Sequence, residues 1–267
     1  MQGSDKFDGE QIRGFWSAQA RDHRQSPSAS WSDVHVIDQE IEEISARITD
    51  GDHVLDIGCA NGFSTVQLAA RGKIEIRGVD YIPEMVEEAK RRLRSLDAPL
   101  SSHVEFAVGD ITRLDEADGA YDKVVVVRVV INLPSWDDQL KGLKEAARVV
   151  KRGGVLLLSE ATIQGWRRLN EFRREWNLPD IPMPAFNRYL DQDRVQAALA
   201  SELDLVELVD FSSSYFVGTR VLKPLLIQAM GADIEVANPD MHWNRFFSKL
   251  PAAGDYGVQR LFVLQKR

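Results

Sequence analysis

The most constraining feature of this chain of 267 residues is the alternation of short apolar runs with amphipathic stretches between residues 53 and 160. Two of the runs, VVVV at 124–127 and VLLL at 155–158, are apolar at every position. A strand without a polar face must be covered on both sides, as the central strands of parallel sheets are. The alternation therefore predicts an α/β fold with a doubly wound, mostly parallel sheet.

The expected strands and helices follow one another at short intervals. Strand patterns lie at 53–57, 74–80, 104–110, 121–130 and 154–160. Helix patterns lie at 63–72, 83–96 and 135–154. Pro83 stands at the first position of the second helix, where a proline fits.

The regions outside this alternation are expected to cover the sheet. Residues 1–50 are predicted to form a helical cap, because an apolar residue recurs every three or four positions from Val34 to Ile48. After Glu160, two long connections at 161–203 and 215–256 interrupt the pattern. Long connections of this kind commonly serve as lids, so we expect substrate-lid insertions there.

Two late strand candidates, at 203–214 and 258–267, complete the expected sheet. We expect the whole chain, 1–267, to form a single domain whose cofactor-binding core spans 51–160.

The composition argues against several function classes. The net charge of −8, from 33 basic and 41 acidic residues, disfavours a nucleic acid partner, whose phosphates attract a basic face. No apolar run is long enough to span a membrane, and the N-terminal residues lack the apolar core of a signal peptide. Cys59 is the only cysteine, so no intrachain disulfide can form, which favours a reducing cytoplasm. A monomer and a homodimer both remain open.

A turn with two glycines, Gly58 and Gly62, follows the first strand in the stretch HVLDIGCANGFST. A phosphate-binding P-loop needs a lysine and a hydroxyl directly after its second glycine, and here Phe63 and Ser64 stand there. A dinucleotide fingerprint has the spacing G-x-G-x-x-G, whereas this turn has G-x-x-x-G. The turn therefore predicts a different ligand.

Three acids indicate what that ligand is. Asp56, Asp80 and Asp110 lie near the carboxyl ends of three successive predicted strands, where open α/β sheets bind ligands. Three carboxylates repel a pyrophosphate, but they suit a ligand with a cationic amine, ribose hydroxyls and an exocyclic amino group. S-adenosylmethionine has all three, and we predict it as the cofactor.

At this point the sequence resembles a known family. The segments VLDIGCANG, GVDYIPEMVEEAK, VGDI, YDKVVVVRVVINLP and RVVKRGGVLLLSE are similar, in order and spacing, to the motifs of class I S-adenosylmethionine-dependent methyltransferases over about residues 50–160. The resemblance implies a Rossmann-like sheet of seven strands with the last strand antiparallel. Ala60 departs from the pattern, since the family commonly has glycine there, and so does the long insertion before the last strand, where the family often has a hairpin.

The resemblance also implies roles for residues of the core. Asp80 is expected to accept both ribose hydroxyls, and Asp110 to meet the adenine amino group. A small tolerated residue explains Cys59 better than a nucleophile does. Trp16 lies in an N-terminal segment that often covers the cofactor in the family. The expected cofactor-binding residues are Asp56, Gly58, Cys59, Asn61, Gly62, Asp80, Tyr81, Ile82, Asp110, Ile111, Arg128 and Trp16.

Fewer sequence features indicate which residues bind the methyl acceptor or act in catalysis. Glu160 and Asn132, at the ends of central strands, and His242, in the last insertion, are the candidate catalytic residues. The predicted substrate-binding residues are Arg173, Asn170, Asn187, Tyr215 and Arg220. The many arginines of the insertions favour an anionic acceptor, because guanidinium binds carboxylate and phosphate through a planar fork of donors. The alternative is that they form ion pairs at the surface. We expect no metal, since no histidine–carboxylate cluster has ligand spacing.

The predicted function is methyl transfer from S-adenosylmethionine to an oxygen or nitrogen of a small polar metabolite, possibly anionic, such as a natural product or a sugar. The alternatives are a protein or RNA methyltransferase and a non-catalytic regulator that binds S-adenosylmethionine. Of these functions, only methyl transfer to a small metabolite requires a closed acceptor pocket of small-molecule size.

Overall fold

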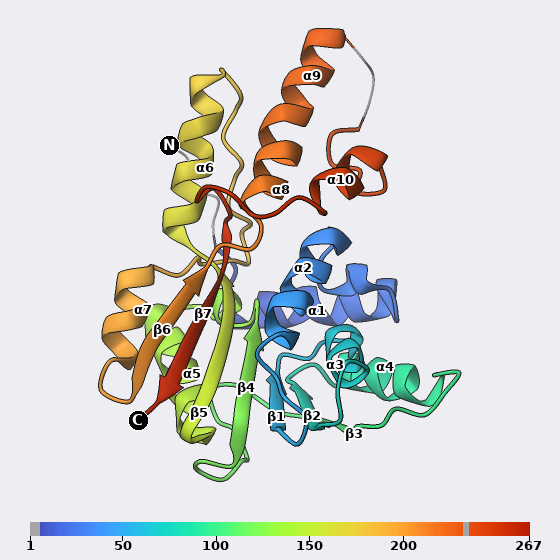
Figure 1. Ribbon diagram of the computed structural model, residues 1–267, viewed down its shortest axis with the longest axis vertical. Helices are drawn as coiled ribbons and strands as arrows, with labels where there is room; N and C mark the ends of the chain where they lie inside the picture. The colour runs from blue at the N-terminus through green and yellow to red at the C-terminus, as the bar shows by residue number, and fades with distance from the viewer. Residues whose placement is uncertain (1–5, 232–234) are drawn as a thin grey trace.

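The computed structural model describes residues 6–231 and 235–267, which contain a seven-stranded sheet (Figure 1). The strands are β1 (His53–Ile57), β2 (Glu75–Asp80), β3 (His103–Val108), β4 (Tyr121–Val127), β5 (Val150–Ala161), β6 (Leu203–Val209) and β7 (Gln259–Lys266). Their order in the sheet is β3-β2-β1-β4-β5-β7-β6. Strands β1 to β5 pair in parallel, and β7 is antiparallel to both β5 and β6. The predicted seven-stranded sheet with an antiparallel last strand is confirmed.

The helices fall into three groups according to their place in the fold. The N-terminal group is α1 (Gly9–His23), the short 3-10 helix η1 (Pro27–Ala29) and α2 (Val34–Ser45). The core helices are α3 (Phe63–Ala69), α4 (Pro83–Arg94), the 3-10 helix η2 (Val130–Asn132), α5 (Trp136–Val149) and α7 (Gln192–Leu199). The late helices are α6 (Ile163–Glu175), α8 (Ser213–Val217), the π-helical η3 (Gly218–Leu222), α9 (Lys223–Met230) and α10 (His242–Phe247).

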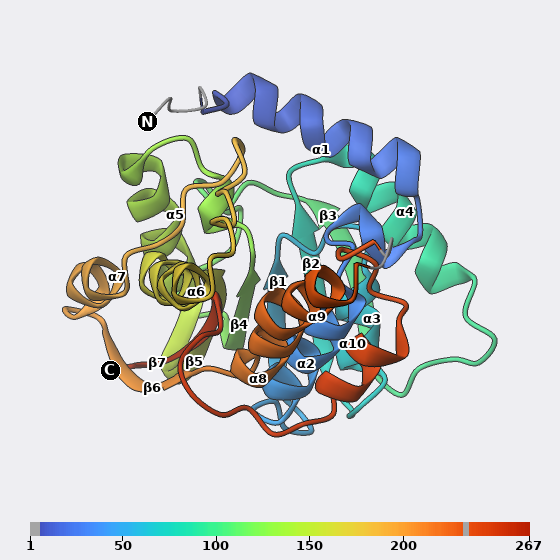
Figure 2. The same cartoon turned by 90° about the horizontal axis from the view of Figure 1, so that it is seen from above.

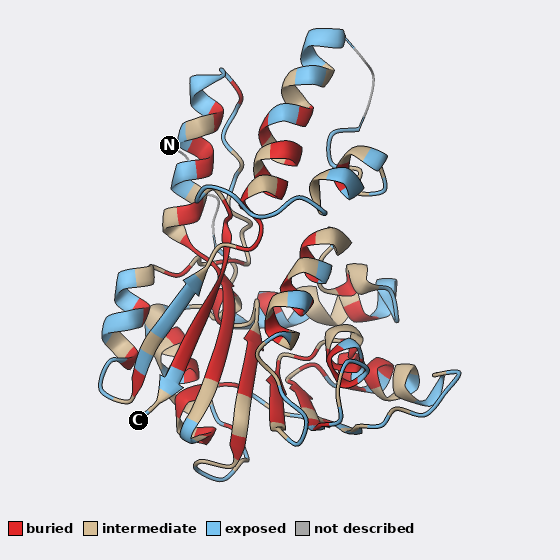
Figure 3. Cartoon of the chain, in the orientation of Figure 1, coloured by how far each residue is buried: buried red, intermediate tan, exposed pale blue. Residues whose placement is uncertain are grey.

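Helices cover both faces of the sheet. The chain moves in one direction along the sheet from β1 to β3 and in the other direction from β4 to β5. Because crossovers between parallel strands are right-handed, α3 and α4 lie on one face and α5 on the other. Helix α2 packs against α3, and α7 packs against α5 (Figure 2). The central strands are thereby buried on both sides, as their apolar sequences require (Figure 3).

Several boundaries differ from the sequence prediction, and one of them lies between α5 and β5. The helix expected to reach residue 154 ends at Val149, and β5 begins at Val150. The pairing of β5 with β4 shifts register between Tyr121 and Lys123, so that 151–154 bulge out of the ladder. Gly153, with φ of 77°, supplies the left-handed residue that this bulge needs.

The late helices form a lobe above the carboxyl edge of the sheet. Figure 1 shows that α6 extends from the end of β5. Beside it, α8, η3 and α9 follow one another as one continuous helical segment. The lobe is built from the two segments expected to be insertions. Their proposed role as substrate lids, and the division of the chain at residues 50 and 160, stay predictions.

Candidate active site

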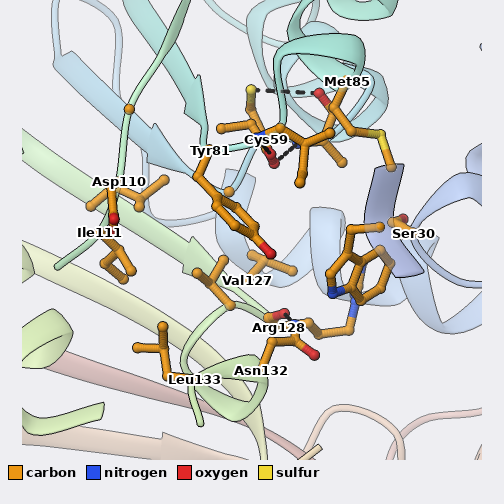
Figure 4. Close-up of a pocket in the computed structure, with 18 of the residues that line it drawn as sticks. Ser30, Cys59, Tyr81, Met85, Asp110, Ile111, Val127, Arg128, Asn132 and Leu133 are labelled. Carbon is orange, nitrogen blue, oxygen red and sulfur yellow. Dashed lines mark hydrogen bonds between the residues drawn. The ribbon is translucent and has the colours of Figure 1, made fainter. Parts of the chain in front are cut away.

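A cavity of about 280 Å³ lies at the carboxyl ends of β1 to β4, beneath the N-terminal helix α1 (Figure 4). Its walls include most of the residues expected to bind the cofactor. These are Asp56, Gly58, Cys59, Asn61, Asp80, Tyr81, Ile82, Asp110, Ile111, Arg128 and Trp16, together with Asn132. The fold therefore brings together side chains from four strand ends and from a helix that is distant in sequence.

The glycine turn forms one wall of this cavity. Gly58 has φ of 78°, and a Cβ atom there would lie 2.0 Å from Cγ2 of Val129, so that only glycine fits. Gly62 also has a positive φ, of 73°, but it does not line the cavity. A Cβ atom on Gly62 would lie 2.9 Å from both Ala89 and Phe106, so this glycine allows α3 to approach α4 and β3. The expected contact of Gly62 with the cofactor stays a prediction.

Ala60 takes an unusual conformation within the same turn. Its φ is 46°, in the left-handed region, where a residue with a side chain is strained. Its backbone N–H donates to Oδ2 of Asp80 at 2.9 Å, and the turn is anchored there. The departure from glycine noted in the sequence thus introduces backbone strain beside the cavity.

Asp80, at the end of β2, is held by two backbone donors. Oδ2 accepts from Ala60 and Oδ1 from the N–H of Ile82, each at 2.9 Å. Burial raises the pKa of Asp80 to about 6, although both hydrogen bonds lower it. Each carboxylate oxygen retains a free lone pair, so the group can still accept hydrogen bonds from a ligand in the cavity.

Asp56, at the end of β1, is more deeply buried. Its Oδ2 accepts from the hydroxyl of Thr65 at 2.5 Å, which ties the turn to the first part of α3. Burial raises the pKa of Asp56 to about 6, against the hydrogen bond from Thr65 and the charge of Arg128, which lower it. Asp56 therefore both supports the turn and presents a carboxyl group to the cavity.

The residues after β2 and β3 form the opposite wall. Ile82 and Ile111 are buried, and both line the cavity. This placement is compatible with core packing and with the predicted contact with the ligand. Asp110 is exposed, and its Oδ1 accepts from the backbone N–H and the hydroxyl of Thr112, each at 2.8 Å. The buried thiol of Cys59 also lines the cavity, and burial raises its pKa, which opposes a role as a nucleophile.

Helix α1 covers the cavity with Gly9, Ile12 and Trp16. An aromatic contact holds it in place, because Phe15 stacks on Phe186 with ring centroids 4.4 Å apart. Trp16 meets the edge of the same ring at 5.8 Å. The sequence indicated a cover by α1, but it gave no signal for this contact with the insertion.

Asn61 connects the turn to the chain after α1. Its Nδ2 donates to the carbonyl oxygens of Arg24 and Ser26, each at 2.7 Å. Ser30, a few residues further on, lines the cavity, as does Met85 of α4. Neither residue was expected at the site, because Ser30 lies outside the motifs and Met85, within GVDYIPEMVEEAK, reads as an apolar residue of a helix.

The end of β4 carries two polar cavity residues. Arg128 has φ of 53°, and its Nη1 donates to Oε2 of Glu40, on α2. Asn132 donates to the carbonyl oxygen of Arg128 at 2.6 Å and accepts from Nδ2 of Asn187 at 2.8 Å. Asn187 is buried and reaches the cavity only through Asn132, so its predicted contact with the acceptor is not seen.

Glu160 does not line the cavity. It is fully buried, and its Oε1 accepts from the backbone N–H groups of Val129 at 2.8 Å and Val130 at 2.7 Å. Burial raises the pKa of Glu160 to about 8. The side chain lies beneath the turn after β4 and shapes it, and the predicted catalytic contact of Glu160 with the acceptor stays a prediction.

The other predicted catalytic residue outside the cavity is His242. It lies exposed on α10 and is not part of the cavity wall. A catalytic base at this position stays a prediction, since the last insertion folds as part of the lobe, outside the cofactor cavity.

The predicted substrate-binding residues of the insertions hold the lobe together. Arg173 donates from Nε to the carbonyl oxygen of Pro179 at 2.9 Å and from Nη1 to that of Arg220. Asn170 exchanges two hydrogen bonds with the backbone of Ile181. Neither side chain lines the cofactor cavity, and the contacts of Arg173 and Asn170 with the acceptor stay predictions.

Tyr215 and Arg220 join the lobe to the start of α2. The hydroxyl of Tyr215 donates to Oδ1 of Asp33 at 2.7 Å, and Nη2 of Arg220 donates to Oδ2 at 2.5 Å. Neither residue lines the cofactor cavity, and their polar groups are engaged within the protein, so that their predicted binding of the substrate stays a prediction. Arg168 and Arg174 likewise form surface ion pairs with Asp255 and Asp180, the alternative that the sequence left open.

No three His, Cys, Asp or Glu side chains of residues 6–231 and 235–267 gather closely enough to hold a metal ion. Within the same ranges, none of the helices combines the length and the apolar character needed to cross a membrane.

Residues 54–154, from β1 into β5, match the family model described as a methyltransferase domain. These residues form a methyltransferase domain of the class I S-adenosylmethionine-dependent type. The 27-O-demethylrifamycin SV methyltransferase of Amycolatopsis mediterranei is 29% identical over 130 residues, which are 45% of this chain and 46% of that protein. The chain spans about half the length of the curated relatives that it matches.

Two solved structures resemble this methyltransferase over nearly its whole length. The N-methyltransferase NodS from Bradyrhizobium japonicum, solved with S-adenosyl-L-homocysteine, has a TM-score of 0.58 at 15% identity and covers 96% of this chain and 98% of its own. The [4+2]-cyclase SpnF has a TM-score of 0.61 at 17% identity and covers 98% of this chain and 97% of its own. At such identities the likeness shows the fold alone.

S-adenosylmethionine is the cofactor of this family, and the cavity of this methyltransferase fits it chemically. Asp80 offers a buried carboxylate with free lone pairs for ribose hydroxyls. Ile82 and Ile111 offer apolar walls for the adenine ring, and the turn at Gly58 lets the backbone approach the ligand.

Proposed function

We propose that this chain transfers a methyl group from S-adenosylmethionine to an oxygen or nitrogen of a small molecule. The observation that carries the proposal is the cavity wall formed by Asp80 and the turn at Gly58, in the register that the family motifs predict. When bound, S-adenosylmethionine supplies an electrophilic methyl group on a sulfonium. The protein's part is to orient the two reactants and to exclude water, which are large contributions to such a reaction.

No histidine is found among the described residues that line the cavity. The proposed reaction therefore depends on positioning, without a histidine base in the wall. It is best suited to an acceptor that needs no base in the wall, such as an amine in its neutral form or an acidic hydroxyl that ionises in water, so that the proton passes to solvent.

The acceptor is proposed to be a small hydroxylated or amine-bearing metabolite of the natural-product kind. The relative from Amycolatopsis is named for an O-demethylated rifamycin, which supports an oxygen acceptor. The anionic acceptor suggested by the arginines loses its support, because Arg173 and Arg220 are engaged inside the lobe. We also propose a cytoplasmic location and a monomer or homodimer, on the sequence features given above.

Two alternatives are weaker. A protein or RNA substrate is disfavoured by the net charge of −8, and RNA most of all. A regulator that binds the cofactor without transferring its methyl group remains the competing class. It predicts tight cofactor binding and no product with any acceptor.

Calorimetric titration of S-adenosylmethionine and S-adenosylhomocysteine tests the cofactor assignment. Replacing Asp80 by Ala removes a buried acceptor and should weaken both ligands by about 1–3 kcal/mol. The matched control is Asp115→Ala, since Asp115 is exposed and lies outside the cavity wall. Unchanged affinity in Asp80→Ala would contradict the assignment.

Methyl transfer itself is tested by mass spectrometry of metabolite extracts incubated with protein and isotopically labelled S-adenosylmethionine. A small product that gains the labelled methyl group supports the proposal. Label found only in protein or RNA supports the alternative enzyme classes, and tight binding with no labelled product supports the regulator.

A further inference from the structure

The charges around the cofactor cavity are strongly unequal. Four aspartates line it, namely Asp56, Asp80, Asp110 and Asp138, whereas Arg128 is the single basic side chain among the described lining residues. S-adenosylmethionine carries two cationic groups, the sulfonium and the ammonium, and one carboxylate. The carboxylates of the wall suit the cationic groups and repel the carboxylate, which leaves one chemically matched partner for it.

The order of the strands places that partner at one end of the cavity. The sheet runs β3, β2, β1, β4, and Asp110, Asp80, Asp56 and Arg128 lie at or just after the ends of these strands in the same order. If Asp80 takes the ribose and Asp110 the adenine, the amino-acid end of the cofactor extends past β1 toward β4. Arg128 is the residue that it meets there.

The guanidinium of Arg128 is held in a fixed position. Its Nη1 donates to Oε2 of Glu40, a side chain that is only 1% exposed, and its Cζ lies 5.3 Å from the centroid of the Trp31 ring. That is the one hydrogen bond found for this guanidinium in the described part of the chain, so Nε and Nη2 remain available. A planar guanidinium that is fixed on one edge can bind a carboxylate with the other.

Glu40 is in turn fixed by other side chains. Its Oε1 accepts from the hydroxyl of Ser159, on β5, and from Nε2 of Gln259, on β7, at 3.1 Å. Glu40 does not line the cavity. A buried carboxylate with three donors keeps its charge compensated, and it holds Arg128 without touching the ligand.

We infer that Arg128 binds the carboxylate of the amino-acid end of the cofactor and that Glu40 is the positioning residue that orients it. This inference rests on the proposed function, since it assumes that the cavity holds S-adenosylmethionine. Arg128 and Glu40 then affect the affinity for ligands that have the amino-acid end, and they do not affect the binding of the nucleoside end.

The test compares two ligands by calorimetry. S-adenosylhomocysteine has the amino-acid end, whereas 5′-methylthioadenosine has the same nucleoside and lacks the carboxylate. Arg128→Met, which keeps the length of the side chain, should weaken S-adenosylhomocysteine by about 10- to 100-fold, the range for a lost hydrogen bond to a charged group. Its affinity for 5′-methylthioadenosine should stay within about twofold of wild type, because that ligand makes no contact with Arg128.

Glu40→Gln should lower the affinity for S-adenosylhomocysteine in the same selective way but by a smaller factor. The neutral amide oxygen holds the guanidinium less strongly than the carboxylate does, so that Arg128 loses part of its fixed orientation. The matched control is Arg168→Met, which removes an arginine from a surface ion pair outside the cavity and should change neither affinity.

The outcomes are separable. Equal weakening of both ligands in Arg128→Met means that the residue supports the fold, and no weakening of either means that it does not bind the carboxylate; both overturn the inference. Wild-type protein that binds neither ligand overturns the proposed function, and the inference with it. Wild-type binding of both ligands upholds the proposed cofactor whatever the variants show.

Discussion

The buried carboxyl of Glu160 makes the stability of this protein depend on pH in a predictable direction. Glu160 is fully buried, and its Oε1 accepts two backbone hydrogen bonds from the turn after β4. Its Oε2 has no hydrogen-bond partner among the residues that the structure describes. Glu160→Gln keeps the oxygen that accepts the two hydrogen bonds and removes the ionisable proton, so the variant imitates the neutral acid.

The size of the pH effect on the free energy of unfolding follows from the pKa of Glu160 in the folded state. Burial raises the pKa of Glu160 from 4.5 to about 8. Because the folded pKa is the higher one, the stabilising contribution of the neutral acid is full below the unfolded pKa and is lost as pH rises through the folded pKa. The free energy of unfolding of wild type should therefore fall, relative to Glu160→Gln, by about 1.4 kcal/mol per pH unit in this window.

Urea denaturation at a series of pH values measures this difference. Between about pH 5 and pH 7.5 the gap between Glu160→Gln and wild type should widen by about 3 kcal/mol and then level off above pH 8. Asp56 and Asp80, whose pKa values are also raised by burial, titrate in both proteins, and so their contributions cancel in the difference.

The matched control is Glu171→Gln, since Glu171 lies exposed on α6, well away from the turn after β4. This variant should follow the pH dependence of wild type. Parallel stability curves for wild type and Glu160→Gln, with a gap that does not change between pH 5 and pH 8, would show that Glu160 is charged in the folded protein.

Three further predictions concern the turn and the lobe. Ala60→Gly should raise the free energy of unfolding by about 0.5–1 kcal/mol in urea denaturation, because the left-handed strain at this residue is relieved, and a lower value would argue against strain. Tyr215→Phe should lower it by about 1–3 kcal/mol, because the acceptor of its hydroxyl, Asp33, is left buried without that donor; no loss would mean that water replaces it. Phe186→Ala removes the ring that stacks on Phe15 and should speed hydrogen exchange in α1, while exchange in α5 stays as in wild type; equal rates in α1 would show that the stack does not hold this helix.

The cofactor half of this protein could be predicted because its signals are local. Strand ends in a parallel sheet meet at one edge, so the positions of Asp56, Asp80 and Asp110 in the sequence already place them together. The apolar runs at 124–127 and 155–158 likewise required a sheet covered on both faces.

The acceptor half could not be predicted in this way. Arg173, Tyr215 and Arg220 are polar residues in insertions, and the sequence cannot show whether such side chains face a ligand or each other. The tertiary structure decides it, because a lobe that buries polar groups must pair them internally.

The same division applies at single residues. The sequence determined that Glu160 ends a central strand on the ligand side, but only the folded chain shows that the turn after β4 lies between its carboxyl group and the cavity. Arg128 was expected near the cofactor from its strand alone, whereas its partner Glu40 lies on a helix 88 residues earlier. Register along a strand is a local property that sequence spacing carries, and contacts between distant elements depend on how the helices pack, which no local pattern encodes.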